Sequence, residues 1–312
     1  MSPSSGDLLE LVRAPAILTV LGDTLAGGAA AGHAFTPRRA ALPLASACFY
    51  AGGMALNDWA DREIDAVERP ERPVPSGRVS PRQALGVAIG LTAAGLALAP
   101  VGGGRRALLV AVPLAAAVWT YDVTAKDRAA GPVVMAACRG LDVLLGAGPG
   151  HLRAALPAAA ALTVHTAGVT VLSRGEVHGT TSGRAWAVAT GTVLTTLAAA
   201  IPTSSRHGAL TSSPGAVGPR SARPLDRALA AGAAVAYAAS CLPAQTTAAR
   251  VPTAARARTA TKAGIRAMIP LQAAWAGRHG HPGAVLALGL VEVAGRVLRA
   301  RSAAAGTQVS ET

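Results

Sequence analysis

The acidic residues of this sequence are concentrated in one short stretch. Six of its 16 acidic residues lie between Asp58 and Glu71, directly after a long apolar block. On a helix, four polar residues of this stretch share an arc of about 100°: Asn57, Asp58, Asp61 and Asp65. Three carboxylates on one face at the end of an apolar segment repel one another unless a cation lies between them. Mg²⁺ binds such oxygen ligands together with substrate phosphates, so this face is a predicted magnesium site.

An alternative for this stretch is a solvated, charge-rich loop of the kind that follows many apolar segments. The converging Asn and Asp side chains favour the metal site, because Glu63 points away from their shared face. The next segment, 69–80, is rich in Pro and Arg. Proline restricts φ and discourages helix, so we expect a stiff, extended turn beside the carboxylates. Within it, Arg72 and Arg78 carry planar guanidinium groups that can donate hydrogen bonds to a phosphate.

The remainder of the chain predicts the elements that position these residues. Of its 312 residues, 51% belong to the apolar set that includes Tyr and 14% are charged, whereas soluble domains carry about 25% charged residues. The apolar residues form blocks of roughly 16–22, the length that crosses a hydrocarbon core of about 30 Å and must then be helical. We therefore expect one all-α domain over residues 1–312, a polytopic membrane bundle of about nine helices. The predicted spans are 14–35, 41–56, 83–103, 107–121, 132–149, 154–172, 185–202, 228–243 and 282–298.

Two further segments are treated separately. Residues 263–276 are apolar but short and contain Arg266 and Pro270, which leaves a half-span and an interfacial helix as alternatives. Residues 203–226 are rich in Ser, Pro, Gly and Arg and predict a flexible loop. The loops on the side that carries the acidic stretch hold more basic residues than the loops on the other side. By the positive-inside rule that side and the N-terminus are expected to be cytoplasmic in a multi-pass cell-membrane protein.

The net charge of +13 and its distribution indicate which classes of partner the protein binds. Its basic residues lie at the ends of the apolar blocks, and only 3% of the residues are aromatic. This pattern indicates contact with the headgroups of membrane lipids and predicts no nucleic-acid partner. Cys48, Cys138 and Cys241 are isolated in apolar blocks, so neither a zinc site nor a disulfide framework is expected.

Residues 57–65 and 72–80 together have the pattern NDxxDxxxD followed by RPxPSGRxS. This composite resembles the first aspartate-rich motif and following loop of the UbiA superfamily of intramembrane prenyltransferases. The resemblance implies an all-helical bundle with a central cavity and a Mg²⁺-diphosphate site near the cytoplasmic face. It also implies transfer of the isoprenyl group of a polyprenyl diphosphate to a small acceptor, usually aromatic.

The resemblance extends to the loop after the fourth predicted span. There the superfamily often has a Tyr and a downstream basic residue, which correspond to Tyr121 and Lys126. Lys126 would contact the diphosphate. The chain has only two lysines, Lys126 and Lys262, among 29 basic residues. Because arginine is used almost everywhere else, the retention of a lysine at position 126 favours a role that arginine does not fill equally well. The alternative is an ordinary positive-inside charge, and Asp122 and Asp127 are expected to be solvated.

The loop after the sixth predicted span departs from the superfamily pattern. Many members carry a second aspartate-rich motif, DxxxD, at this place, whereas this chain has Ser173-Arg174-Gly175-Glu176-Val177-His178. Glu176 would be the ligand of a second Mg²⁺, and Arg174 would bind the phosphate. The alternatives are a single metal ion, another donor, lost catalysis, or Arg174 and His178 on the phosphate with Glu176 paired to Arg174. The Ser-Arg-Gly-Glu-Val string is similar to an EboC-like branch of the superfamily.

A few charged residues lie inside the predicted spans. Asp23, Arg139 and Asp142 would be costly next to lipid and are expected to face the cavity. Arg139 and Asp142, three residues apart on a helix, either bind the acceptor or pair with each other. His165 is expected to be a packed, hydrogen-bonded histidine.

The function expected from these residues is Mg²⁺-dependent isoprenyl transfer within the membrane. Asp58, Asp61 and Lys126 are the predicted catalytic residues. Two other classes remain as alternatives: a non-catalytic isoprenoid-binding or scaffold protein, and a transporter, although a transporter would spread its acids over several spans. The predicted substrate-binding residues are Asn57, Arg72, Arg78, Tyr121, Arg139, Asp142 and Arg174, and the predicted metal ligands are Asn57, Asp58, Asp61, Asp65 and Glu176.

Overall fold

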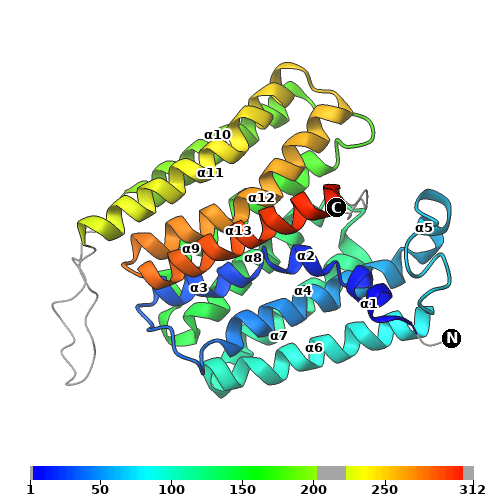
Figure 1. Ribbon diagram of the computed structural model, residues 1–312, viewed down its shortest axis with the longest axis horizontal. Helices are drawn as coiled ribbons and strands as arrows, with labels where there is room; N and C mark the ends of the chain where they lie inside the picture. The colour runs from blue at the N-terminus through cyan, green and yellow to red at the C-terminus, as the bar shows by residue number, and fades with distance from the viewer. Residues whose placement is uncertain (1–2, 202–222, 305–312) are drawn as a thin grey trace.

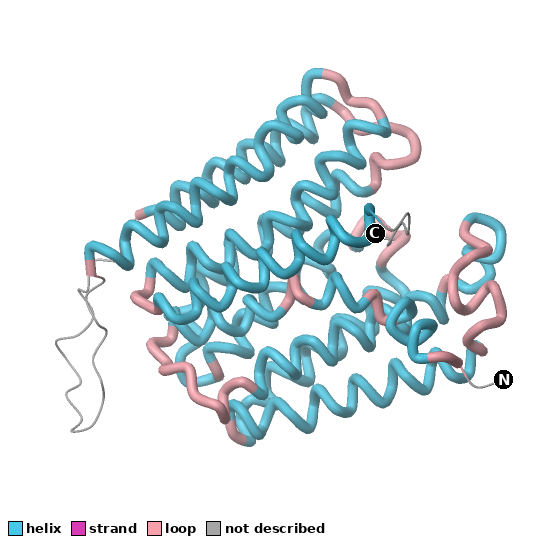
Figure 2. The backbone as a smooth tube through the Cα atoms, viewed as in Figure 1, coloured by secondary structure: helices cyan, strands magenta, loops and turns pink. Residues whose placement is uncertain are grey.

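The computed structural model describes residues 3–201 and 223–304. Every regular element in these two ranges is a helix, which confirms the expected all-α bundle (Figures 1 and 2). Two short 3₁₀ turns and one π-helix, Tyr121–Ala125, join longer elements. The α-helices are α1 (Ser5–Leu11), α2 (Ala14–Ile17), α3 (Leu21–Ala30), α4 (Ala41–Ala60), α5 (Arg62–Glu68), α6 (Pro81–Gly103), α7 (Leu108–Thr120), α8 (Gly131–Ala147), α9 (Leu152–Ser173), α10 (Ser182–Ala200), α11 (Pro224–Arg250), α12 (Ala254–Arg278) and α13 (Pro282–Ala304).

Within the described ranges, four helical segments are long and apolar enough to cross a membrane: Pro81–Gly103, Arg105–Ala125, Pro149–Ser173 and Pro224–Arg250. The remaining long helices pack among them (Figure 1). The expected first span, 14–35, is interrupted, because the chain turns at residues 18–20 between α2 and α3. Of the expected loop 203–226, residues 203–222 lie outside the described residues, and Pro224 already begins α11.

The segment left open at 263–276 is the buried half of α12. This helix runs from Ala254 to Arg278, and all of residues 267–277 are buried. Neither a half-span nor an interfacial helix describes it. Four basic residues in the first half of α12 lower its mean hydropathy: Arg256, Arg258, Lys262 and Arg266. Neighbouring helices surround the second half, because α12 packs against α3, α9, α11 and α13.

Helices α3 and α8 approach each other more closely than side chains would allow. A Cβ at Gly27 would stand 1.8 Å from the backbone oxygen of Val143, and a Cβ at Gly146 would stand 2.0 Å from that of Thr24. Glycine on both helices therefore lets the two backbones touch, as small residues commonly do between membrane helices. The contact fixes α8, which carries Arg139 and Asp142, against α3, which carries Asp23.

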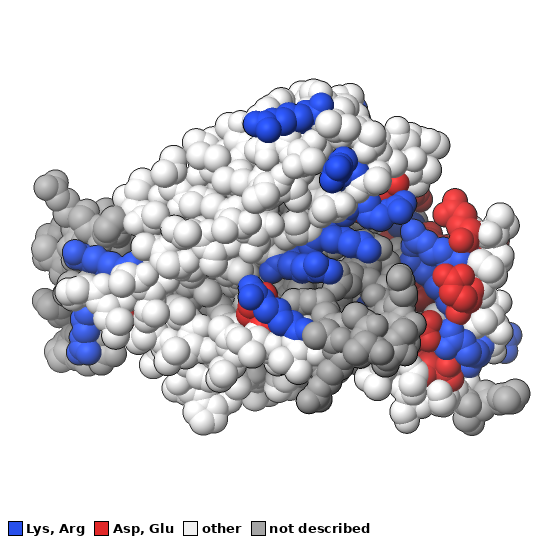
Figure 3. Space-filling view, turned by 45° about the horizontal axis from the view of Figure 1, so that its top comes forward, with Lys and Arg blue, Asp and Glu red and all other residues white. Residues whose placement is uncertain are grey.

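The charged side chains are unevenly distributed over the surface. Figure 3 shows acidic and basic side chains together at the end of the molecule that carries α1 and α5, while much of the flank is uncharged. The turns after α5, α7, α9 and α11 lie at this end, which we call the mouth end (Figure 1). The bundle thus collects the predicted site loops at one end.

Candidate functional site

Asp61 and Lys126 meet at the mouth end from two different helices. Asp61 is the residue between α4 and α5, and Lys126 directly follows the π-helix at the end of α7. The Lys126 ammonium donates to Asp61 Oδ1, and the Asn57 amide donates to Asp61 Oδ2 over 3.1 Å. Three of the predicted site residues are thereby in direct contact.

Two arginines hold the other carboxylates of this face. Arg72 Nη1 lies 2.6 Å from Asp65 Oδ2 and 3.7 Å from Asp58 Oδ1. Arg13, which was not among the predicted site residues, lies 3.3 Å from Asp58 Oδ1. Asp58 and Asp65 are 2% and 3% exposed, so a counter-charge is needed at each. The expected turn beside the carboxylates is therefore present, and it places Arg72 on them.

Arg78 does not join this group. Its guanidinium donates to Asp7 Oδ1 over 2.8 Å, to Glu10 Oε2 over 2.6 Å and to the Glu71 carbonyl over 2.6 Å. The hydrogen bond to Glu10 raises the pKa of Arg78, and hydrogen bonds with Ser4 lower the pKa of Asp7. The predicted phosphate ligand thus ties α1 to the turn 69–80, and the structure gives it no contact with the carboxylate face.

The turn after α9 also reaches the mouth end. Arg174 donates to the carbonyls of Lys126, over 3.1 Å, and of Arg128, so it braces the turn that follows the π-helix. Glu176 is not paired with Arg174: its Oε2 lies 3.9 Å from Arg258 Nε, while its buried Oε1 has no hydrogen-bond partner. The pairing with Arg174 that the sequence left open is therefore wrong.

The π-helix Tyr121–Ala125 contributes a carboxylate that the sequence analysis assigned to solvent. Asp122 is only 2% exposed, and its Oδ2 lies 3.3 Å from the place where a Cβ at Gly53 would stand. The Lys126 backbone N–H donates to the Tyr121 carbonyl over 3.0 Å, five residues back, which is the π-helical pattern. In the sequence, the signal for this residue is the Tyr121-Asp122 pair at the end of a span. The burial of Asp122 opposite Gly53 depends on the register shift of the π-helix.

A cavity that is partly open to solvent extends from this region into the bundle, with about 580 Å³ of empty space when the open solvent at its opening is included. Tyr121 and Asp122 line its outer part, and Ser46, Arg139 and Asp142 line another part. Apolar side chains supply most of the wall between them, among them Phe49, Met54, Leu114, Val118 and Met135. Along α4 the polar residues Ser46 and Asn57 are 11 positions apart, or about 16 Å at 1.5 Å per residue.

The buried charges in this cavity are not paired as their spacing indicates. Arg139 Nη1 lies 2.5 Å from Asp23 Oδ2 on α3, and no ion pair with Asp142 is present among the described residues. Gln272 on α12 donates to Asp23 Oδ1 over 2.7 Å. Mutual pairing of Arg139 and Asp142 is therefore wrong. His165 is packed as expected, with Nδ1 2.9 Å from the Tyr237 hydroxyl and Nε2 3.0 Å from the Gly264 carbonyl.

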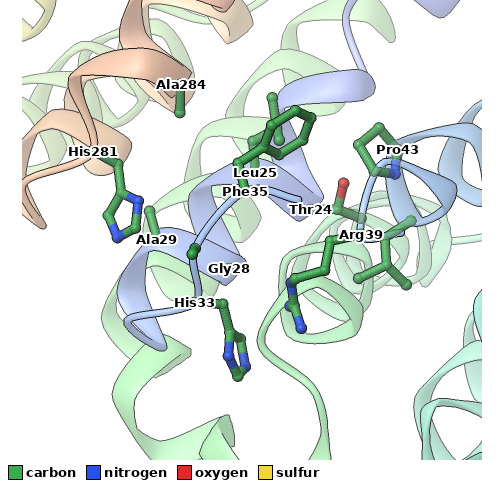
Figure 4. A pocket seen from close by; sticks show the side chains of 12 residues that line it. Thr24, Leu25, Gly28, Ala29, His33, Phe35, Arg39, Pro43, His281 and Ala284 are labelled. Carbon is green, nitrogen blue, oxygen red and sulfur yellow. The ribbon is translucent and has the colours of Figure 1, made fainter. Parts of the chain in front are cut away.

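A second cavity is lined by the second half of α3 and the segment after it, at the end of the bundle away from α1 and α5 (Figure 1), and Figure 4 shows its side chains. Its polar groups include His33, Arg39 and His281, and no carboxylate lines it. Arg39 donates to the Gly146 carbonyl over 2.5 Å, and His33 Nε2 lies 2.8 Å from the Ala147 carbonyl. Both side chains therefore serve the unpaired carbonyls at the C-terminus of α8, which is a structural role.

The donor set at the mouth end fits magnesium that arrives with a phosphate better than a resident metal ion. Among the described residues, no three His, Cys, Asp or Glu side chains form a group that could hold a metal by themselves. Asn57, Asp58 and Asp61 nevertheless offer hard oxygen ligands, and the unpartnered Glu176 Oε1 is a further one. Mg²⁺ commonly needs only one or two carboxylates, because waters and substrate phosphates complete its coordination.

Fold and site together define a helical membrane protein with paired carboxylates and cations at one end and a mainly apolar cavity whose wall includes the neighbouring Tyr121 and Asp122. The model of the UbiA prenyltransferase family matches residues 20–255, and the chain belongs to this family. The predicted magnesium face, the turn with Arg72 and the π-helix all lie inside the matched range.

Similar proteins agree with this family. A digeranylgeranylglyceryl phosphate synthase of Halobacterium salinarum is 37% identical over 149 residues, 45% of this chain and 51% of that protein. The synthase of the same name from Ignicoccus hospitalis is 48% identical over 106 residues, 32% of this chain and 34% of that protein. The bacteriochlorophyll synthase 33 kDa chain of Cereibacter sphaeroides is 33% identical over 39% of this chain and 41% of its own length. The chain thus matches about half or less of the length of these relatives.

Two solved structures have the same fold. The apo UbiA homologue from Aeropyrum pernix K1 superposes with a TM-score of 0.58 at 18% identity, covering 83% of this chain and 96% of that one. A UbiA homologue from Archaeoglobus fulgidus bound to DMAPP and Mg²⁺ gives a TM-score of 0.57 at 15% identity, covering 85% and 98%. At these identities the likeness establishes the helical membrane fold.

Proposed function

We propose that this protein transfers the isoprenyl group of a polyprenyl diphosphate to a small acceptor inside the membrane. The observation that carries the proposal is the mouth itself. Lys126 and Arg72 each hold a carboxylate of the Asn57–Asp65 face, and Tyr121 and Asp122, just before Lys126 in the chain, line the mainly apolar cavity. Such a mouth offers both kinds of group that a magnesium diphosphate needs, carboxylate oxygens for the metal and fixed cations for the phosphates.

The mouth residues would bind and orient the diphosphate. Asn57, Asp58, Asp61 and Asp65 are the proposed metal-binding set, with Glu176 a candidate for a second ion. When bound, Mg²⁺ would supply Lewis-acid stabilisation of the diphosphate charge. Lys126 and Arg72 would then shift from their carboxylates towards the phosphate oxygens. Tyr121 and Asp122 line the adjoining wall, and Arg174 keeps the turn of Lys126 in place.

The chemical step is a substitution at the first carbon of the isoprenyl chain. The bond between that carbon and the diphosphate oxygen breaks, and its electron pair leaves with the diphosphate. The cations that have moved onto the phosphate oxygens stabilise this developing charge. The allylic cation is then captured by an electron pair of the acceptor, which loses a proton. The apolar wall of Phe49, Leu114 and Val118 would keep water from capturing the cation first.

A second candidate function, isoprenoid binding without catalysis, is favoured by the turn after α9. It carries one carboxylate, Glu176, where many family members have two, and that carboxylate faces Arg258. A protein of this type would bind the diphosphate and release no pyrophosphate.

Pyrophosphate release separates the two candidates. The full chain in lipid nanodiscs would be given geranyl diphosphate or geranylgeranyl diphosphate with Mg²⁺, in the presence of a lipid extract that contains acceptors. We expect pyrophosphate and a prenylated lipid detected by mass spectrometry, both lost with EDTA. Saturable binding of the diphosphate without pyrophosphate would support the scaffold instead. The relatives named above make a prenylated glyceryl phosphate one product class to look for.

We also propose that the mouth end and the N-terminus face the cytoplasm. The basic residues of the turns at 122–130 and 250–254 support this orientation by the positive-inside rule. Cysteine accessibility tests it: a cysteine at Arg128 should react with a membrane-impermeant maleimide only after the cells are opened.

A further inference from the structure

Of the two buried carboxylates near Arg139, only Asp23 forms an ion pair with it. Arg139 lies on α8, one turn before Asp142, but its guanidinium is directed to α3. There Nη1 donates to Asp23 Oδ2 over 2.5 Å and to the Thr19 carbonyl over 3.0 Å, and Nη2 donates to the Thr19 hydroxyl over 3.2 Å. Asp23 also accepts from Gln272 over 2.7 Å, so its charge is fully compensated.

Asp142 is the carboxylate left over. Its Oδ2 accepts a hydrogen bond from the Ser46 hydroxyl, while its Oδ1 is buried and has no hydrogen-bond partner. The residue is 5% exposed and lines the same cavity as Ser46 and Arg139. A buried carboxylate oxygen without a hydrogen-bond donor destabilises the fold, because the solvation that the oxygen has lost is not replaced. A ligand that brings a donor would remove this cost.

The shape and charge of the cavity restrict which ligand can do so. Between Asp142 and the mouth the wall is mainly apolar, which fits a compact apolar body. An isoprenyl tail has no hydrogen-bond donor and would leave Oδ1 unsatisfied. A carboxylate on the ligand would add a negative charge beside two carboxylates that have one guanidinium between them.

We propose that Asp142 Oδ1 accepts a hydrogen bond from an uncharged hydroxyl or amino group of the acceptor, and thereby selects hydroxylated apolar acceptors over carboxylic acids. This assignment rests on the proposed function for the identity of the ligand as the acceptor. Ser46 positions the carboxylate by its own hydrogen bond. Asp142 is a specificity residue here, because the diphosphate is held at the mouth.

Binding of three matched probes tests the assignment without Mg²⁺ or a prenyl diphosphate. The probes are 2-naphthol, its methyl ether 2-methoxynaphthalene, and 2-naphthoate, which share one ring system and differ in the polar group. Affinities are measured by isothermal titration with the full chain in nanodiscs. We expect 2-naphthol to bind at least about tenfold more tightly than the ether, since hydrogen bonds to charged groups contribute about 1.5–3 kcal/mol. 2-Naphthoate should bind least tightly.

Variants assign the preference to one residue. Asp142→Leu should abolish the preference for 2-naphthol over the ether, and the milder Asp142→Asn should reduce it at least about threefold by removing the charge. Asp127→Asn, which removes an exposed carboxylate in the turn after the π-helix, should keep the full preference. If Asp142→Leu does not fold, Asp142→Asn decides.

Three results would overturn the proposal. The wild type binds 2-naphthol and the ether equally, as expected if Asp23 and Asp142 satisfy each other with a shared proton. The preference survives unchanged in the folded variants. Or 2-naphthoate binds most tightly, which would make Arg139 the recognition group. Because no transfer is measured, these outcomes are independent of whether the protein releases pyrophosphate.

Discussion

The Lys126 ammonium donates to Asp61, a residue 65 positions earlier in the chain. One partner lies between two helices and the other after a π-helix, so the contact joins the first predicted motif to the second predicted loop. A cation that is paired with a carboxylate costs less to hold near the membrane than an unpaired one, and it is in place when a diphosphate arrives. Asp61 and Lys126 therefore share one proposed role, binding of the magnesium diphosphate, which variants of either residue can test.

Replacing Asp61 should remove activity without unfolding the protein. We expect Asp61→Ala to lower Mg²⁺-dependent pyrophosphate release at least about 100-fold, because the departing charge loses preorganised compensation. Membrane insertion should be unchanged, since Asp61 lies at a helix junction and not in a packed core. Glu63→Ala is the matched control: its side chain is 85% exposed and paired with Arg62. Normal turnover by Asp61→Ala would refute the site.

Lys126 should not be replaceable by arginine. Lys126→Ala removes the charge, and Lys126→Arg keeps it but exchanges a compact ammonium for a wider planar group. We expect both variants to lower turnover and diphosphate affinity. Lys126→Arg should retain more of both than Lys126→Ala, but less than the wild type. Lys262→Arg, at the other lysine of the chain, should behave as the wild type. If both Lys126 variants are as active as the wild type, Lys126 is only a topological charge.

Glu176 and Arg174 should give different responses to Mg²⁺. If Glu176 holds a second ion, Glu176→Gln lowers turnover strongly and weakens the dependence on Mg²⁺ concentration. Arg174→Ala should lower turnover at every Mg²⁺ concentration, because Arg174 braces the turn of Lys126. The exposed Glu68→Gln is the control for charge. A mild Glu176→Gln variant with unchanged Mg²⁺ titration would contradict the second ion.

The glycine contact between α3 and α8 should tolerate no added methyl group. In Gly146→Ala the new Cβ would meet backbone atoms of Thr24, which cannot rotate away. We expect a loss of about 1–3 kcal/mol in stability, seen as a lower melting temperature in detergent. Gly90→Ala, on an open face of α6 with no atom within 4 Å, should be neutral or slightly stabilising. Equal melting temperatures for the two variants would show that α3 can shift away from α8.

His279 predicts a pH dependence of stability. Burial lowers the pKa of this histidine, in the turn between α12 and α13, from 6.5 to about 4. Between pH 4 and 6.5 the unfolded chain therefore binds more protons than the folded one, and stability falls as the pH falls through this window. His279→Gln should show a smaller loss of melting temperature from pH 7 to pH 5. The same loss in both proteins would contradict this contribution.

The sequence predicted the membrane bundle and the aspartate face because both are local patterns. Apolar length identifies a span, and helical spacing places Asn57, Asp58 and Asp61 on one side. The composite with the turn 72–80 then indicated the family that the comparison established.

Partners that are distant in the sequence were missed, because contacts between distant segments leave no local pattern. The spacing of Arg139 and Asp142 indicated a pair, but Asp23 lies closer to the guanidinium because α3 and α8 touch at their glycines. Arg78 carries a group that can bind phosphate, but in the structure it donates to the carboxylates of Asp7 and Glu10 on α1. The second half of α12 is buried by its neighbours, which local hydropathy does not report.

The site of Asp23 has a consequence for how the chain is made. This carboxylate belongs to the first apolar segment, whereas its partners Arg139 and Gln272 follow 116 and 249 residues later. At synthesis rates of about 5–20 residues per second, Arg139 emerges roughly 6–23 s after Asp23 and Gln272 roughly 12–50 s after it. Until then an unpaired carboxylate in the bilayer is costly. We therefore expect the first segment to reach its final packing only when α12 is complete, because only then does Asp23 have both Arg139 and Gln272 as partners.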